Sequence, residues 1–533
     1  MEAINQECVI APGDLGQAPI SLTTTATNLT GNWRFARPEL AESVSPCTAV
    51  CPLHNDIRSI TDLLHRSDPE AALRLLRRTN PMPAVTGRVC PGFCRHGCTR
   101  AELDQSVEVP RLERYLGDLG LARPHSAPDC MRRERAAVIG SGPAGIAAAY
   151  YLARKGIRVT LFEERAAPGG MLAYGIPAYR LPKDILHSEL DNLLANLPID
   201  LVTRRRVAPE EMEAMGREYD FLFCAPGLWG TSLPGEFANT PRVRHGLELL
   251  EAINNGNVPP ESRLVVVGGG NAALDSARCL SRLGKEVQIV YRRSRSRMPA
   301  YAEEVRQAVD EGIPVLEERL IRDMEETDTG LRLHLARAVE SDSGIEPGES
   351  LEQLDTELVV AAVGQTQEAV FPAGPWVFLI GDHDEGAGNV AQALASGRSA
   401  AERALASLGL EPEQPPSCAE SEEEAKRRTP WGICLLEPEA PCEIPELEPA
   451  ERKDNFREIS PPPGSREVTD LASRCLQCGR CTACGMCWFF CPDLAIRVDS
   501  RRQNVEIDTD YCKGCGICAS VCPRGVIRMR EDI

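Results

Sequence analysis

The stretch Arg135-Ala-Ala-Val-Ile-Gly140-Ser-Gly142-Pro-Ala-Gly145 decides the fold, because it reads as a buried strand that turns through three glycines into a helix. Glycines at the spacing G-x-G-x-x-G permit a tight turn, the close approach of a pyrophosphate and a close helix–strand contact. A helix-like run covers residues 146–155, and a second strand over 157–162 ends at Glu163, which would accept a hydrogen bond from a ribose hydroxyl. Together they predict a Rossmann-like dinucleotide site, with contacts expected from Gly140, Gly142, Pro143, Ala144, Gly145 and Glu163.

Residues 264–273 repeat this turn as Leu264-Val-Val-Val-Gly268-Gly-Gly270-Asn-Ala-Ala273, with Ala in place of the third glycine, which the motif allows. The strand that follows ends in Arg292-Arg293 instead of an acid. Two cations there would accommodate a 2′-phosphate, so NADP is favoured over NAD. The alternative is a solvated basic loop, since Arg295 and Arg297 follow. The contacts expected at this site are Gly268, Gly270, Asn271, Ala272, Ala273, Arg292, Arg293 and Gly364.

Two dinucleotide sites in one chain usually mean one flavin and one nicotinamide, so we expect FAD at the first turn. Gly381-Asp382, after an apolar strand, looks like the second FAD element of this class. Hydride transfer to a flavin needs stacking and a dry pocket more than an acid or base. Accordingly we assign no catalytic residue, and Cys224 and Cys279 are interpreted as packed core thiols. Further FAD contacts are expected from Gly170, Arg180, Gly381 and Asp382.

The C-terminal region carries two similar cysteine runs, each closed by a proline. The spacing C-x-x-C-x-x-C-x-x-x-C-P, present twice, is that of bacterial ferredoxins with two 4Fe–4S clusters, in which the fourth cysteine ligates the other cluster. Tetrahedral zinc is the alternative for C-x-x-C pairs. The predicted sets are Cys481, Cys484, Cys487 and Cys522 for one cluster, and Cys512, Cys515, Cys518 and Cys491 for the other.

Composition excludes several classes of function. The net charge of −19 argues against nucleic acid or an anionic membrane as partner. No apolar stretch approaches the roughly 18 residues that span a bilayer, and the start Met1-Glu2-Ala3-Ile4 lacks the pattern of a secretory signal. The 22 cysteines are too sparse for a disulfide scaffold. These features predict a cytoplasmic protein.

Residues 47–405 resemble the small subunit of glutamate synthase and its relatives, among them the N-terminal half of dihydropyrimidine dehydrogenase. The tail resembles the ferredoxin-type delta subunit of 2-oxoacid:ferredoxin oxidoreductases. The resemblance implies FAD, a nicotinamide, usually NADP where the arginine pair is present, and an N-terminal helical iron–sulfur domain. The stretches that carry it are Cys51-Pro-Leu-His-Asn-Asp-Ile57, Thr79-Asn-Pro-Met-Pro83, Gly87-Arg-Val-Cys-Pro91, Tyr174-Gly-Ile-Pro-Ala-Tyr-Arg-Leu-Pro182, Tyr291-Arg-Arg293 with Met298-Pro299, Phe490-Cys-Pro-Asp-Leu-Ala-Ile496 and Tyr511-Cys-Lys-Gly-Cys-Gly-Ile-Cys518.

The resemblance also implies two clusters in the N-terminal domain. Carried over, one is held by Cys51, Cys90, Cys94 and Glu113. The other retains Cys47 and Cys98, but its upstream Cys-x-x-Cys is missing, and Thr86 replaces a further family cysteine.

A segment that closely resembles the missing one, Ala472-Ser-Arg-Cys475-Leu-Gln-Cys478, stands before the ferredoxin motif. We hypothesise that Cys475 and Cys478 join Cys47 and Cys98 around a fourth cluster, in the same chain or across a dimer. The alternative is that Cys475 and Cys478 are spare thiols or bind a labile metal.

The predicted fold class is α/β, with two Rossmann-like domains, an N-terminal helical iron–sulfur domain and a C-terminal α+β bacterial-type ferredoxin domain. We expect an enzyme, an FAD-dependent NAD(P)H:acceptor oxidoreductase that exchanges electrons with a 2-oxoacid oxidoreductase, a ferredoxin or another iron–sulfur protein through up to four 4Fe–4S clusters. The alternatives are a glutamate synthase small subunit-type subunit and a non-catalytic electron-wiring subunit. The expected segments are an extension (1–45), the helical iron–sulfur domain (46–130), the FAD domain in two parts (131–240 and 365–410), the nicotinamide domain (241–364), a Pro/Glu-rich linker (411–470) and the ferredoxin domain (471–533).

Overall fold

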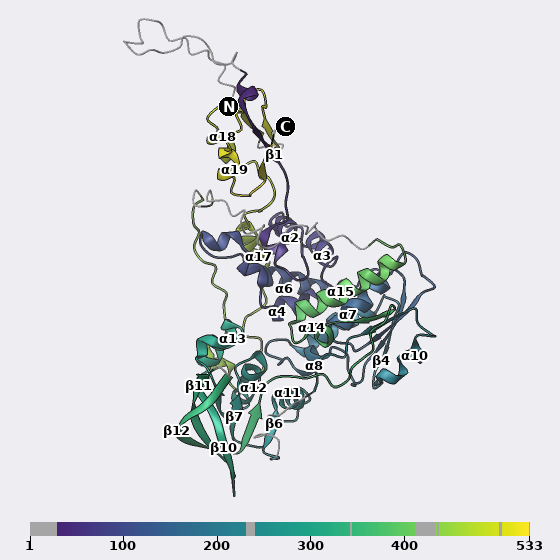
Figure 1. Cartoon of the computed structure of the whole chain (residues 1–533), viewed down its shortest axis with the longest axis vertical. Helices are drawn as coiled ribbons and strands as arrows, with labels where there is room; N and C mark the ends of the chain where they lie inside the picture. The colour runs from purple at the N-terminus through teal and green to yellow at the C-terminus, as the bar shows by residue number, and fades with distance from the viewer. Residues whose placement is uncertain are drawn as a thin grey trace.

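The computed structural model describes residues 29–230, 240–341, 344–411, 433, 436–499 and 504–531. Two α/β domains and a helical domain form the body, and a small module that contains the C-terminus projects from one end of the long axis (Figure 1). The α/β class expected from the sequence is confirmed. Among the described residues, no helix combines the length and the apolar character needed to cross a membrane.

The first α/β domain is built on a five-stranded parallel sheet with the order β14-β5-β2-β3-β4. Helix α7 (Pro143–Arg154) is alanine-rich and buried from Ala144 to Ala153, because helix α15 (Val390–Ser407) covers the face that the sheet leaves free. The two helices lie so close that a Cβ on Gly397 would stand 2.0 Å from the Ala144 carbonyl oxygen. The other elements are β2 (Arg135–Ile139), β3 (Arg158–Phe162), α8 (Met171–Tyr174), α9 (Lys183–Leu194), β4 (Ile199–Val202), α10 (Met212–Met215), β5 (Phe221–Cys224), β14 (Val377–Leu379) and α14 (Asp382–Glu385).

The second α/β domain repeats this architecture with the strand order β6-β13-β7-β8-β9, again parallel. An antiparallel sheet of three long strands, which the sequence analysis did not anticipate, is inserted between β9 and β13. It packs against β7, β8 and β13 through Ile321, Leu331, Leu333 and Leu335. The elements are β6 (Val243–His245), α11 (Gly246–Asn254), β7 (Arg263–Val267), α12 (Asn271–Arg282), β8 (Glu286–Tyr291), α13 (Ala302–Asp310), β9 (Val315–Glu317), β10 (Arg319–Thr327), β11 (Gly330–Ser341), β12 (Gly344–Thr356) and β13 (Leu358–Ala361).

The helical domain combines residues from both ends of the chain. Two of its helices begin directly after an aspartate that caps the N-terminus. Asp56 and Asp68 accept hydrogen bonds from the Ser59 and Ala71 backbone N–H groups at 3.2 and 2.9 Å. Helix α17 (Ser465–Ser473) completes the apolar core, to which it adds Val468, Leu471 and Ala472. The remaining helices are α1 (Pro46–Ala49), α2 (Ile57–His65), α3 (Pro69–Leu76), α4 (Pro83–Val89), α5 (Phe93–His96) and α6 (Val109–Gly120).

The projecting module also joins the two ends. Strand β1 (Ala36–Leu40) pairs antiparallel with β17 (Ile527–Glu531), so part of the expected N-terminal extension is a strand of this module. Residues 1–28 of that extension lie outside the described part. The module further contains α18 (Met486–Phe489), β15 (Ile496–Asp499), β16 (Asn504–Ile507) and α19 (Ile517–Val521).

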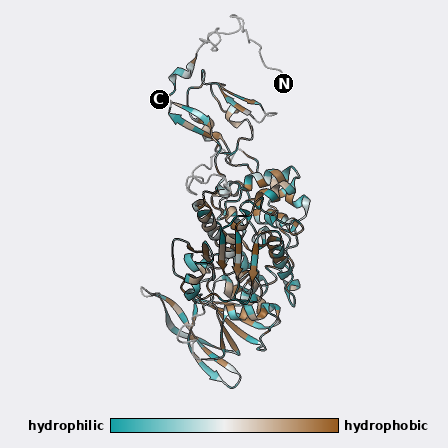
Figure 2. Cartoon of the chain, turned by 90° about the vertical axis from the view of Figure 1, so that its right-hand side faces the viewer, coloured by the Kyte–Doolittle hydropathy of each residue, from teal (hydrophilic) through white to brown (hydrophobic). Residues whose placement is uncertain are grey.

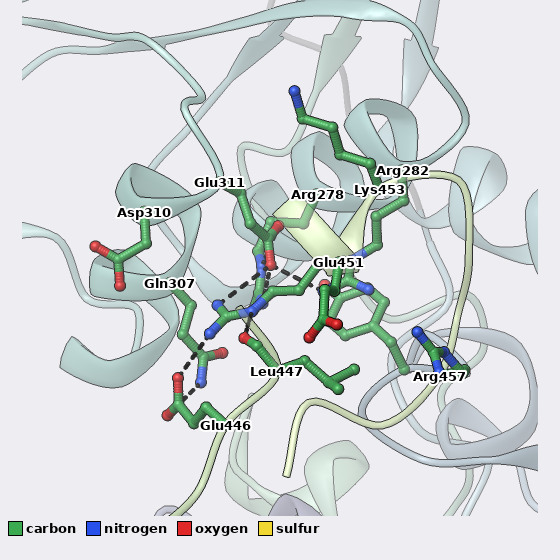
Figure 3. Close-up of polar contacts among 12 residues, drawn as sticks. Arg278, Arg282, Gln307, Asp310, Glu311, Glu446, Leu447, Glu451, Lys453 and Arg457 are labelled. Atoms are coloured by element: carbon green, nitrogen blue, oxygen red, sulfur yellow. Dashed lines mark hydrogen bonds and ion pairs between the residues drawn. The ribbon is translucent and has the colours of Figure 1, made fainter. Parts of the chain in front are cut away.

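Residues 436–464, here called the strap, lie within the expected linker yet are fixed against the body by buried ion pairs (Figure 3). Arg452 pairs with Glu446 at 2.8 Å and lies 3.7 Å from Glu311 of the second α/β domain. Arg278 and Arg282 of α12 bind the same Glu311 at 2.7 and 2.8 Å.

Farther along the strap, Glu458 pairs with Arg88 of α4 at 2.8 Å and with Arg114 of α6 at 3.0 Å. The strap therefore fastens the second α/β domain to the helical domain. In Figure 2 the hydrophobic residues concentrate in the middle of the body, where the charged strap packs Phe456 and Ile459 against the core of the second α/β domain and Cys442 against that of the helical domain.

Candidate nucleotide and iron–sulfur sites

One cavity of about 1080 Å³ lies between the two α/β domains and is lined by both glycine-rich turns. Most of the predicted nucleotide contacts line it. Gly145 and Ala273 do not, because each lies behind its turn in the helix–strand contact, as expected for the third motif position. The predicted residues that line the cavity are Gly140, Gly142, Pro143, Ala144, Glu163, Gly170, Arg180, Gly381 and Asp382 for FAD, and Gly268, Gly270, Asn271, Ala272, Arg292, Arg293 and Gly364 for NADP.

The first turn needs its glycines for different reasons. A Cβ on Gly140, where φ is +97°, would stand 2.2 Å from the Ala225 carbonyl oxygen, and one on Gly145 would stand 2.0 Å from the Gly140 carbonyl oxygen. A Cβ on Gly142 would meet nothing within 4 Å and would occupy the cavity itself. Gly142 also caps α7 without a side-chain hydrogen bond, so the first N–H groups of the helix are free to receive an anion.

The second turn has the same geometry. A Cβ on Gly268 would stand 2.5 Å from the Ala362 carbonyl oxygen, whereas one on Gly270 would meet nothing within 4 Å. Gly270 caps α12 without a side-chain hydrogen bond, and α12 is long enough to present a full N-terminal turn. Two helix N-termini thus border one cavity, which is the arrangement that two dinucleotide pyrophosphates require.

Glu163 lies at the end of β3 and is almost fully buried. Its Oε1 accepts a hydrogen bond from the Arg165 backbone N–H at 2.7 Å, and its Oε2 accepts one from the Ser141 N–H at 3.1 Å and another from the Ser141 hydroxyl. The carboxylate is therefore held at the cavity wall where the motif places the ribose of a dinucleotide.

The two arginines at the end of β8 differ in their surroundings. Arg293 Nε lies 3.7 Å from Glu340 of β11, which also pairs with Arg297. Arg292 is exposed, lines the cavity and makes no ion pair or hydrogen bond within the described part of the chain. Of the predicted pair, Arg292 is thus the cation that is free to bind a phosphate.

Arg180 lines the cavity, but two carboxylates hold it: Asp275 of α12 at 2.8 Å and Glu304 of α13 at 3.0 Å. Its neighbour Tyr179 is buried with the Arg278 and Arg282 guanidinium groups over its ring. This loop of the first α/β domain is therefore locked to the second, and its charge is balanced before any nucleotide binds.

Cys51, Cys90, Cys94 and Glu113, called the inner group, lie near one another, with Cys90 at the end of α4, Cys94 on α5 and Glu113 on α6. The pKa of Cys51 is raised to about 12, chiefly by burial and also by the nearby Glu113 and Cys90. Burial likewise raises the pKa of Glu113 to about 7, although hydrogen bonds from Thr86 and Asn80 oppose the shift. The sequence analysis did not predict that these two residues donate to Glu113, although Asn80 lies in the stretch 79–83 and Thr86 stands where the family has a cysteine.

Cys47, Cys98, Cys475 and Cys478, called the bridging group, also come together. Burial raises the pKa of Cys47 well above its usual value, and the neighbouring thiols of the other three raise it further.

Hydrogen bonds to backbone carbonyl groups hold the segment 474–478, which carries Cys475 and Cys478, in place. Arg100 donates to the Arg474 carbonyl oxygen at 2.7 Å, and Gln477 donates to the Arg58 carbonyl oxygen at 3.2 Å. The tail segment therefore reaches the N-terminal cysteines within the same chain.

The ferredoxin cysteines lie in two groups, each of which combines three cysteines of one run with the fourth cysteine of the other. Burial raises the pKa of Cys487 to about 11, with contributions from Cys522, Cys484 and Cys481, and a hollow lined by these four cysteines lies beside them. Burial also raises the pKa of Cys512, where the nearby Cys491 of the other run contributes.

The donor sets fit cubane clusters better than single ions. Within the described residues, no three or more His, Cys, Asp or Glu side chains are arranged to hold one metal ion. In a 4Fe–4S cluster each ligand can bind a different iron, so the ligands need not converge on one point. A thiol whose pKa is raised by burial loses its proton more readily when a nearby cation such as iron stabilises the thiolate.

Comparison with known families agrees with this arrangement. Residues 134–373 match the pyridine nucleotide-disulphide oxidoreductase model, residues 40–124 the dihydropyrimidine dehydrogenase domain II model with its 4Fe-4S cluster, and residues 505–528 the 4Fe-4S binding domain model. The chain therefore combines a nucleotide-dependent oxidoreductase domain with iron–sulfur domains on both sides of it, and this combination, predicted from the sequence, is confirmed.

Among curated relatives, the beta subunit of the NADP(+)-dependent formate dehydrogenase of Moorella thermoacetica is 34% identical over 424 residues, which cover 67% of this chain and 59% of the relative. The beta subunit of the NADPH-Fe(3+) oxidoreductase of Geobacter sulfurreducens is 33% identical over 352 residues, which cover 61% of this chain and 52% of the relative. The chain thus spans somewhat more than half the length of these relatives. Among solved structures, Mycobacterium tuberculosis FprA in complex with NADPH is 18% identical with a TM-score of 0.43, and the match covers 52% of this chain and 85% of that chain.

Proposed function

We propose that the chain is the nicotinamide-dependent flavin subunit of an electron-transfer complex, in which the nicotinamide nucleotide and FAD share the cavity and electrons pass to or from a protein partner through up to four 4Fe–4S clusters. When bound, FAD supplies the exchange between hydride and single-electron chemistry, and the clusters supply single-electron transfer. The residues of the chain bind and orient these groups and exclude water, which agrees with the absence of an assigned catalytic acid or base.

One observation supports this proposal above the others: the cysteine groups follow one another in a row that leads from the cavity to the projecting module. Val89 lines the cavity, and the next residue, Cys90 of the inner group, packs against the core of the first α/β domain. Cys94 of the inner group lies near Cys47 of the bridging group.

This row of cysteine groups continues into the projecting module. Cys478 of the bridging group lies near Arg524, two residues from Cys522 of the ferredoxin set. Cys484 and Cys515 at the far end are exposed, so a partner can approach the last clusters closely.

An anaerobic titration tests the proposal. The purified holoprotein should show flavin absorbance that bleaches on addition of NADPH, followed by partial bleaching of the iron–sulfur absorbance. The proposal fails if neither NADPH nor NADH reduces the flavin, which would leave a non-catalytic electron-wiring subunit.

Anaerobic affinity capture should recover a redox protein such as a 2-oxoacid oxidoreductase, a ferredoxin or another iron–sulfur enzyme. Electron flow in either direction agrees with the geometry.

Replacing Arg292 by Ala should weaken the binding of NADPH far more than the binding of NADH. A hydrogen bond from a charged group contributes about 1.5–3 kcal/mol, which corresponds to roughly 10- to 100-fold in affinity. Arg293→Ala is the matched control and should have a smaller effect, because Glu340 lies 3.7 Å from that guanidinium and partly balances its charge. The measurement is the KM of each nucleotide in flavin reduction. If Arg292→Ala raises the KM for NADPH and the KM for NADH by the same factor, the arginines form a solvated loop.

A further inference from the structure

The carboxylate of Glu113 is held through one oxygen only. Asn80 Nδ2 donates to Oε1 at 2.6 Å, and the Thr86 hydroxyl donates to the same Oε1 in a short hydrogen bond. No described residue hydrogen-bonds to Oε2. The nearby groups that raise the pKa of Cys51 and Cys90 include this carboxylate, so the side chain lies beside the thiols of the inner group.

Close helix packing creates this arrangement. Thr86 is on α4 and Glu113 is on α6, and the two helices touch at glycines. A Cβ on Gly87 would stand 2.3 Å from the Arg114 backbone nitrogen, and a Cβ on Gly117 would stand 2.2 Å from the Ala84 nitrogen. Without these two glycines the helices could not approach closely enough for a threonine hydroxyl, which is short, to reach the carboxylate.

The donors are themselves fixed. Asn80 is fully buried and Thr86 is 1% exposed. The Asn80 side-chain oxygen accepts from the Met82 backbone N–H at 3.0 Å, and its amide donates to the Thr86 hydroxyl at 2.8 Å. The Thr86 hydroxyl accepts one hydrogen bond, and its single proton has two acceptors in reach, Glu113 Oε1 and the Met82 carbonyl oxygen at 3.1 Å. The charged carboxylate is the stronger acceptor, and such chains of hydrogen bonds polarise one another.

We propose that Asn80 and Thr86 are positioning residues that hold Glu113 by Oε1, so that Oε2 alone is presented to iron beside Cys51, Cys90 and Cys94. This inference rests on the ligand role of Glu113 within the proposed function. Groups that hydrogen-bond to a metal ligand fix its orientation and tune its donor strength. Two donors on Oε1 withdraw negative charge from the carboxylate, and the charge and hydrogen bonding of the ligands help to set the reduction potential of a cluster.

Thr86→Val removes the hydroxyl with little change of shape, Thr86→Ser restores it, and Asn80→Leu removes the other donor. The matched control is Thr79→Val, because Thr79 is also buried and its hydroxyl binds the Asn55 side chain, not Glu113. Iron content, the EPR spectrum of the reduced holoprotein and a redox titration are measured for each variant. We expect Thr86→Val and Asn80→Leu to shift the EPR signal of one cluster and to lower its midpoint potential, or to lose about one cluster of iron.

We expect Thr86→Ser and Thr79→Val to match the unaltered protein. The inference is overturned if Thr86→Val leaves both the spectrum and the potential unchanged, or if Thr79→Val changes them equally, since the role would then be packing alone. Glu113→Ala tests the ligand role itself. An unchanged EPR spectrum in this variant would show that Glu113 is not a ligand, and the inference would lose its basis. Flavin bleaching by NADPH tests the proposed function independently of all these variants.

Discussion

A protein in which Ala replaces Gly142 should fold normally and hold almost no flavin. The added methyl group meets no chain atom within 4 Å, so the fold tolerates it, but it enters the cavity at the N-terminus of α7. A pyrophosphate kept away from that terminus loses hydrogen bonds worth about 1.5–3 kcal/mol each, and losing two of them weakens binding by roughly 100-fold or more. The measurement is the ratio of flavin to protein after purification, with circular dichroism and iron content as checks of the fold.

Gly464→Ala is a matched control for this change. Gly464 also caps a helix, α17, with extended backbone, no side-chain cap and no atom within 4 Å of the position of an added Cβ, but it lies away from the cavity. It should keep its flavin. If Gly142→Ala binds flavin as well as Gly464→Ala does, the cavity beside α7 is not the flavin site.

The second large effect concerns the bridging group. A full-length protein that carries both Cys475→Ser and Cys478→Ser should contain about four irons per chain fewer than the unaltered protein, because one cube of four would lose two ligands. The EPR signals of the ferredoxin pair should survive, since their eight cysteines are untouched. Cys47→Ser should perturb the same signal that the double variant removes.

Cys442→Ser provides the control for the double variant. Cys442 packs against the same apolar core as Cys475, and its backbone N–H donates to Gln105 at 2.7 Å, yet it belongs to none of the four ligand sets. This variant should keep all its iron. A Cys475→Ser, Cys478→Ser protein that also keeps all its iron would show that the two cysteines are spare thiols.

The parts of the fold that local sequence encodes were predictable. Each glycine turn carries its strand, helix and acidic or basic strand end within 30 residues or so, and the sheets formed around them as expected. The strap was not predictable, because its glutamates read as solvated charges until their partners are known. Glu446 meets Arg306 across 140 positions, and Glu458 meets Arg88 across 370. The hold on Glu113 was missed for a similar reason, since only the packing of α4 against α6 brings Thr86 to it.

Strand β1 and its partner β17 lie far apart along the chain, and Glu39 meets Arg530 at 3.5 Å across 491 positions. At roughly 5–20 residues per second, β1 waits about 25–100 s on the ribosome before its partner exists. Throughout that time its edge is unpaired, and an unpaired edge is a template for association with other chains. Cys47 and Cys98 wait almost as long for Cys475 and Cys478. In the cell, the projecting module and the bridging group can therefore complete their contacts only after the distant C-terminal segments of both have been synthesised.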